Sequence, residues 1–82
     1  MDKLAAMDIF VTLMNCGSFA RTAETFGISE GVAAQATGQL ESQLGVKLLE
    51  LHYGGIVPTE AGLQYYKYAQ IALDAARNAG LL

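Results

Sequence analysis

Glycines divide the first half of the chain into three short stretches with helical patterning. Each stretch begins after a residue whose side chain can cap a helix, and each ends at a glycine. The capping residues are Asp2, Ser18 and Ser29, and the glycines are Gly17, Gly27 and Gly45. Such side chains accept a backbone N–H at the start of a helix, and glycine readily takes the left-handed conformation that ends one. The turns are so short that the three helices must pack closely, and the second and third form a helix-turn-helix pattern.

The apolar residues of these stretches predict the core. Apolar side chains three and four positions apart lie on one face of a helix. The faces expected to be buried comprise Leu4, Met7, Phe10, Val11 and Met14 in the first helix, Phe19, Ala23 and Phe26 in the second, and Val32, Ala33, Ala36, Leu40 and Leu44 in the third.

Residues 46–58 have a different pattern, typical of a β-hairpin. Two runs of β-prone or apolar residues flank Gly54-Gly55, and Pro58 ends the second run. Thr59 and Glu60 then begin a last helix with an acidic first turn, which we expect to reach about residue 79. The chain thus predicts a winged helix-turn-helix over residues 1–58, followed by a long helix within residues 59–82.

The last helix carries apolar residues on more than one side, and such a helix is buried on more than one side. We expect one face to cover its own domain and the rest to bind a second copy of the chain. The predicted dimerisation residues are Tyr65, Tyr66, Tyr68, Ala69, Ala72, Leu73 and Ala76.

Composition agrees with a small domain that gains core from a partner. The 82 residues are 52% hydrophobic and only 16% charged. So short a chain buries a small fraction of its surface, and dimerisation is a common way for it to enlarge the core. The net charge is −3, whereas nucleic-acid binders usually carry a basic patch. The basic residues are scattered, at Lys3, Arg21, Lys47, Lys67 and Arg77.

The sequence predicts no enzyme, no cofactor and no metal site. Cys16 has no second cysteine for a disulfide, and we interpret it as a buried, inert thiol. His52 lacks a plausible nucleophile and carboxylate partner, and one His with one Cys is too few to bind a metal. No apolar run reaches the roughly 18 residues of a membrane span, so we expect no membrane partner and a cytoplasmic protein.

Several spaced motifs resemble the N-terminal domain of the LysR-type transcription regulators of bacteria. They are Met7–Val11 followed by Gly17-Ser18-Phe19, Ala23 with Phe26–Ser29, Leu40-Glu41 with Leu44–Glu50, and Thr59–Gly62. The resemblance covers essentially the whole chain. It implies a mainly α, winged helix-turn-helix fold with a three-helix core, a short β-hairpin wing and a long C-terminal dimerisation helix. It also implies a homodimer that binds double-stranded DNA. A complete family member continues into an effector-binding domain, so we expect either an excised or a free-standing domain.

The residues with which that family binds DNA are replaced here. The resemblance places the family's Ser/Thr-rich turn, its Ser-Arg pair and its wing arginines at positions that hold Gly31, Ala34, Gln35, Leu51 and Gly55. Arginine suits phosphate and guanine because its planar fork carries a permanent charge and donates two parallel bonds. We therefore expect weak or altered DNA binding. The DNA-facing residues predicted are Arg21, Ser29, Glu30, Gly31, Ala34, Gln35, Gly38, Gln39, His52 and Gly55.

Two interpretations of that surface stay open. The third helix holds Glu30 and Glu41 but no cation, and Arg21 and Lys47 are the nearest candidates for phosphate contacts. Gln35 and Gln39 can pair with adenine, although a solvated glutamine is the commoner case. The alternative is an interaction protein that keeps the fold without binding DNA. It would pair with an intact LysR-type regulator, or dock another protein on the small residues Gly31, Ala34, Gly38 and Ser42.

Overall fold

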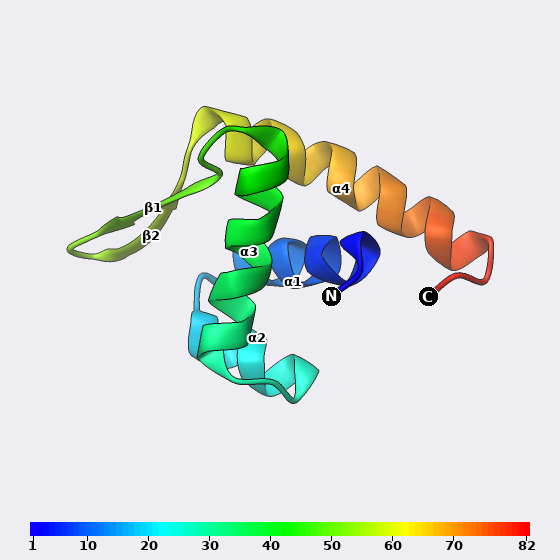
Figure 1. The fold of residues 1–82 in the computed structure, drawn as a ribbon, viewed down its shortest axis with the longest axis horizontal. Coiled ribbons are helices and arrows are strands. Elements are labelled where there is room, and N and C mark those ends of the chain that lie inside the picture. Colours follow the sequence, from blue (N-terminus) through cyan, green and yellow to red (C-terminus); the bar gives the residue numbers. More distant parts are fainter.

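A computed structural model describes all 82 residues as four helices and one β-hairpin (Figure 1). In chain order the elements are α1 (Lys3–Cys16), α2 (Phe19–Phe26), α3 (Glu30–Leu44), β1 (Leu49–His52), β2 (Gly55–Pro58) and α4 (Glu60–Asn78). The mainly helical, winged helix-turn-helix fold expected from the sequence is thereby confirmed.

Side-chain caps begin all four helices. Asp2 accepts the N–H of Ala5 at 2.8 Å, and Thr59 accepts that of Gly62 at 3.0 Å. The serines of the two inner turns act in the same way, with Ser18 and Ser29 each accepting an N–H at 3.1 Å. Gly17, Gly27 and Gly45 end α1, α2 and α3 with φ between 65° and 69°. The predicted helix boundaries are confirmed because both kinds of signal act locally.

The core lies where α1, α3, α4 and the base of the wing meet. Phe10 of α1, Leu40 of α3 and Leu48 before β1 are almost completely buried, together with Ala69 and Leu73 of α4. The ring of Phe10 also meets Tyr65 edge-on, with centroids 5.6 Å apart. Residues 59–82 therefore share one core with residues 1–58.

Two residues predicted to be buried on α3 are exposed. Val32 is 36% and Leu44 is 42% exposed. Figure 1 shows that α3 crosses α1 instead of running beside it. Ala33, Ala36 and Leu40 are buried along the middle of α3, whereas Val32 lies in its first turn and Leu44 is its last residue. Helical periodicity predicts the inward face but not how far a neighbouring helix covers it.

The wing is a two-stranded antiparallel hairpin that projects from the helical body (Figure 1). Leu49 pairs with Pro58 and His52 with Gly55, which leaves Tyr53 and Gly54 as the turn. Among the helices, none is both long and apolar enough to cross a lipid bilayer.

Candidate nucleic-acid interface

Half of the ten residues predicted to face DNA are exposed on α3. Gly31, Ala34, Gln35 and Gly38 are exposed, and Glu30 is exposed in the first turn. These residues share one side of the helix, opposite the buried Ala33, Ala36 and Leu40. The structure therefore brings the α3 part of the predicted site together.

Two other predicted residues of this region are engaged within the chain. The hydroxyl of Ser29 accepts the N–H of Val32 and caps the helix. The side chain of Gln39 is only partly exposed, and its amide donates to the carbonyl of Met1 at 3.4 Å. Gln35, in contrast, has no hydrogen-bond partner within the chain.

The glycines of this face are not required by the fold. A Cβ at Gly38 would meet nothing within 4 Å, and one at Gly31 would meet only the hydroxyl oxygen of Ser29, at 3.8 Å. Neither glycine has a positive φ. Each costs about 1 kcal/mol of helix stability relative to alanine. The helix surface therefore lacks a side chain on both sides of Gln35, which lies four residues after Gly31 and three before Gly38.

The tip of the wing is apolar where a DNA-binding wing is expected to be basic. Leu51 is 79% exposed, and Tyr53 is fully exposed. His52 contacts the carboxylate of Glu50 at 2.9 Å, so its ring faces an acid of its own strand. Arg21, the remaining predicted DNA contact, is exposed on α2 and forms no ion pair.

Gly55 has a structural reason to be glycine. Its φ is +128°, a conformation that residues with a side chain rarely adopt. The interpretation of Gly55 as a position that has simply lost an arginine is therefore incomplete, because an arginine there would strain the backbone. Leu51 lies in a regular strand, so an arginine could occupy its position without strain.

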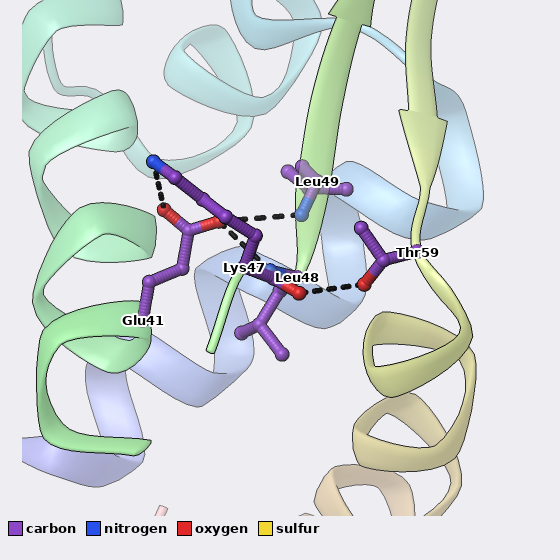
Figure 2. A network of polar contacts seen from close by, with 5 residues as sticks. All are labelled: Glu41, Lys47, Leu48, Leu49 and Thr59. Atoms are coloured by element: carbon purple, nitrogen blue, oxygen red, sulfur yellow. Dashed lines mark hydrogen bonds and ion pairs between the residues drawn. The ribbon is translucent and has the colours of Figure 1, made fainter. Parts of the chain in front are cut away.

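A polar network fixes the base of the wing to α3 (Figure 2). One carboxylate oxygen of Glu41 accepts the N–H groups of Leu48 at 2.8 Å and Leu49 at 3.3 Å. The other oxygen lies 3.6 Å from the ammonium of Lys47. The Glu41 side chain is only 14% exposed, so it does not oppose DNA as its acidic character suggested. Lys47, whose side chain is 78% exposed, is paired with this carboxylate.

The same base is fixed to α4. The hydroxyl of Thr59 donates to the carbonyl of Lys47 at 2.6 Å, as Figure 2 shows, and its N–H donates to the carbonyl of Leu48 at 3.0 Å. Gly62 lies so close to Leu48 that a Cβ would overlap the Leu48 carbonyl oxygen. The sequence did not predict these contacts, because nothing in the spacing of the residues reveals which of them meet.

Ion pairs use two of the five cations. Besides Lys47, Arg77 contacts Asp8 at 3.6 Å and Asp74 at 3.3 Å. Lys3, Arg21 and Lys67 are the remaining basic side chains, and they lie on different helices. The structure therefore does not assemble the scattered cations into a basic patch on α3 or the wing.

Most residues predicted to form the dimer contact instead face their own domain. Ala69, Leu73 and Ala76 are buried in the chain, and Ala72 packs against the core. Tyr65 packs on Phe10, with its hydroxyl buried and unpartnered, and burial raises the pKa of that hydroxyl. Tyr66 donates a hydrogen bond to Asn15 of α1. Only Tyr68, which is 70% exposed, faces outward.

A different side of α4 presents an unpaired, partly apolar row. It comprises Gln64, Tyr68, Ile71 and Ala75, all of them exposed. Their spacing of four, three and four residues is the a/d spacing of a coiled-coil seam. We call these four residues the α4 seam. An open groove lined in part by Leu44, Val46 and Ala61 continues the seam toward the end of α3.

Cys16 is less buried than the sequence suggested. It is partly exposed at the end of α1, where its sulfur lies 3.3 Å from the hydroxyl oxygen of Thr22. This hydrogen bond lowers the pKa of the thiol below its ordinary value. No group of three metal-ligating side chains gathers around it or elsewhere.

Comparisons with known proteins place this geometry in a family. Residues 4–63 match the model of the bacterial regulatory helix-turn-helix proteins of the lysR family. The HTH-type transcriptional regulator AdmX of Serratia plymuthica is 35% identical over 98% of the chain, and an uncharacterized HTH-type transcriptional regulator of Haemophilus influenzae is 41% identical over 90%. The chain covers 26% of each, about a quarter of their length.

A solved structure matches the fold over nearly the whole domain. In the crystal structure of a CbnR_DBD-DNA complex, the protein is 29% identical to this chain with a TM-score of 0.88, covering 98% of this chain and 91% of that one. The order of helices, wing and long helix is thus shared with a protein solved on DNA. The chain therefore belongs to the LysR family of bacterial regulatory helix-turn-helix proteins.

Proposed function

We propose that this chain is the DNA-binding module of a LysR-type transcription regulator, and that it binds duplex DNA as a dimer with low affinity. The observation that carries the proposal is the match of its fold, over 98% of the chain, to a protein crystallised in complex with DNA. In a helix-turn-helix protein the N-terminal part of the second helix of the motif enters the major groove. Here that helix is α3, and its exposed face is free.

The low affinity follows from the charges at this face. Affinity for DNA comes largely from cations that neutralise phosphates and release counterions. Neither α3 nor the wing carries a lysine or arginine beyond the paired Lys47, and Glu30 adds a negative charge at the helix start. Arg21 is the only unpaired cation on the helix-turn-helix. Few phosphates can therefore be neutralised by each copy of the chain.

The proposed dimer forms through the α4 seam. A seam with heptad spacing is complementary to a second copy of itself, and two-fold interfaces of identical patches are the commonest in homo-oligomers. Tyr68 and Ile71 would bury their exposed apolar surface there. Two copies related in this way would place their α3 helices about 34–36 Å apart along the duplex, one helical turn.

Binding to a labelled random-sequence duplex at about 50 mM salt tests the proposal directly. We expect a dissociation constant of about 1–100 µM, in or near the range of non-specific binding, that weakens as salt rises. The absence of binding at 100 µM protein would contradict the proposal and favour a module that contacts only other proteins. Sedimentation over a concentration series reports the dimer in the same buffer.

A further inference from the structure

We infer that Gln35 is the side chain with which this domain selects a base, and that the base is adenine, an inference that rests on the proposed function. Gln35 is singled out by its position on α3, by its free amide and by the chemistry of its neighbours. A preference for one base is a separate property from binding to DNA at all, which is the proposed function.

Gln35 is the longest side chain on the most outward part of the N-terminal half of α3. Gly31 precedes it by four residues and Gly38 follows it by three, so both lie beside it on the helix surface. Neither glycine has a side chain that could hold the duplex away. The helix backbone can therefore approach the groove closely at this point. The Gln35 amide is then the group that extends farthest toward the base edges.

In the N-terminal half of this face, the amide of Gln35 is also the one polar group free both to donate and to accept a hydrogen bond. The hydroxyl of Ser29 is engaged as a cap, and the amide of Gln39 donates to Met1. Glu30 can only accept hydrogen bonds, and Ala34 can offer only its methyl group. In the N-terminal half of this face, which enters the groove, Gln35 alone presents an unengaged donor beside an unengaged acceptor.

A donor beside an acceptor matches adenine. In the major groove adenine offers N7 as acceptor and its N6 amino group as donor, and glutamine pairs with both at once. Guanine offers two acceptors there, which suit arginine instead. The small methyl of Ala34, next to Gln35, is suited to contact a neighbouring thymine methyl. The preferred half-site should therefore contain an adenine whose replacement weakens binding.

Selection from a pool of randomised DNA duplexes tests the inference, using the wild-type chain and three variants. Gln35→Ala removes the amide, and Gln35→Arg substitutes a fork that suits guanine. Gln43→Ala is the matched control, because Gln43 is exposed near the far end of α3 and has no hydrogen-bond partner in the chain. We expect the wild type and Gln43→Ala to enrich the same adenine. Changing that A·T pair to G·C should weaken the binding of the wild type and of Gln43→Ala about fivefold or more.

The variants at position 35 separate the possible outcomes. Gln35→Ala should bind the A·T and G·C versions of the site equally, and Gln35→Arg should prefer the G·C version. Enrichment of one site by the wild type and by Gln35→Ala alike would overturn the inference and leave the proposed function standing. Wild-type binding without any enriched sequence would also overturn it. Failure of the wild type to bind any duplex would instead contradict the proposed function.

Discussion

Gly62 and Gly38 are both helical glycines, but a side chain would meet different surroundings at each. The Gly62 position faces the Leu48 carbonyl, where α4 meets the base of the wing, and a Cβ would overlap it. The Gly38 position faces open space. Gly62 is therefore required by close backbone contact, whereas the fold does not require Gly38, which weakens its helix.

The substitution Gly62→Ala should lower the free energy of unfolding by roughly 1–3 kcal/mol, the usual cost of overpacking. Gly38→Ala, the matched control, should raise it by about 1 kcal/mol because alanine favours the helix. Urea unfolding followed by circular dichroism measures both. A Gly62→Ala variant as stable as wild type would show that α4 does not contact Leu48 this closely.

The hydroxyls of the neighbouring Tyr65 and Tyr66 differ in their hydrogen bonding. The Tyr65 hydroxyl is buried without a partner, so Tyr65→Phe should leave stability unchanged or raise it by about 1 kcal/mol. Tyr66→Phe should cost about 0.5–1.5 kcal/mol, because it removes the hydrogen bond to Asn15. Thermal or urea unfolding at neutral pH distinguishes the two. A larger loss of stability in Tyr65→Phe than in Tyr66→Phe would contradict the structure at both hydroxyls.

The raised pKa of Tyr65 also predicts a pH dependence. Burial favours the neutral phenol in the folded chain, so the unfolded chain loses this proton first as pH rises above about 10. The unfolded state then binds fewer protons than the folded state, and stability falls with rising pH. Tyr65→Phe should show a smaller loss than wild type between pH 9 and pH 11.

How well the sequence predicts the contacts of individual residues depends on how far apart the two partners lie along the chain. The caps at Asp2, Ser18, Ser29 and Thr59 were predictable because each bonds an N–H three residues on. The contacts of Glu41 with Leu48 and Leu49 were not, since they depend on how the chain turns after α3. The constraint on Gly55 was also missed, because its positive φ belongs to the backbone geometry where the hairpin turn meets β2.

At the scale of elements, α4 shows what periodicity can and cannot predict. Apolar residues on more than one side predicted a helix that covers its own domain with one face, but periodicity did not reveal which residues form that face. Ala69, Leu73 and Ala76 cover the domain itself. The α4 seam, with Tyr68 and Ile71, is the row that remains exposed. Only the placement of α4 over α1 reveals which row is which.

A charged substitution in the α4 seam should dissociate the proposed dimer into monomers. Ile71 is 65% exposed, and Ile71→Glu would place two carboxylates in the interface near the two-fold axis. We expect a monomer by analytical ultracentrifugation at concentrations where the wild type is dimeric, with an unchanged circular dichroism spectrum. Leu63→Glu is the control, because Leu63 is exposed on α4 but lies outside the seam. Equal effects of the two variants would exclude the seam as the interface.

In the whole molecule, the shape favours DNA binding, whereas the charge does not. The chain keeps the helices, the wing and the long helix of its family, and its fold matches that of a protein solved on DNA. Its net charge is −3, and Lys47 and Arg77 are used within the chain. Spaced motifs predict the shape because they report local structure. The pairs of Lys47 with Glu41 and of Arg77 with Asp8 could not be predicted, because the partners of each come from different segments of the fold.

Adding a single cation to the wing tests the central claim most directly. Leu51 is exposed on β1, and Leu51→Arg adds a charge where the duplex should pass, whereas the control Gln70→Arg adds it on the exposed surface of α4. The measurement is the dissociation constant for a random-sequence duplex between about 50 and 200 mM salt. We predict that Leu51→Arg tightens binding and steepens the log–log salt dependence by about 0.9 for each bound copy, and that Gln70→Arg does neither. Equal slopes for wild type and Leu51→Arg, or equal gains from the two substitutions, would contradict the assignment of α3 and the wing as the DNA-binding face.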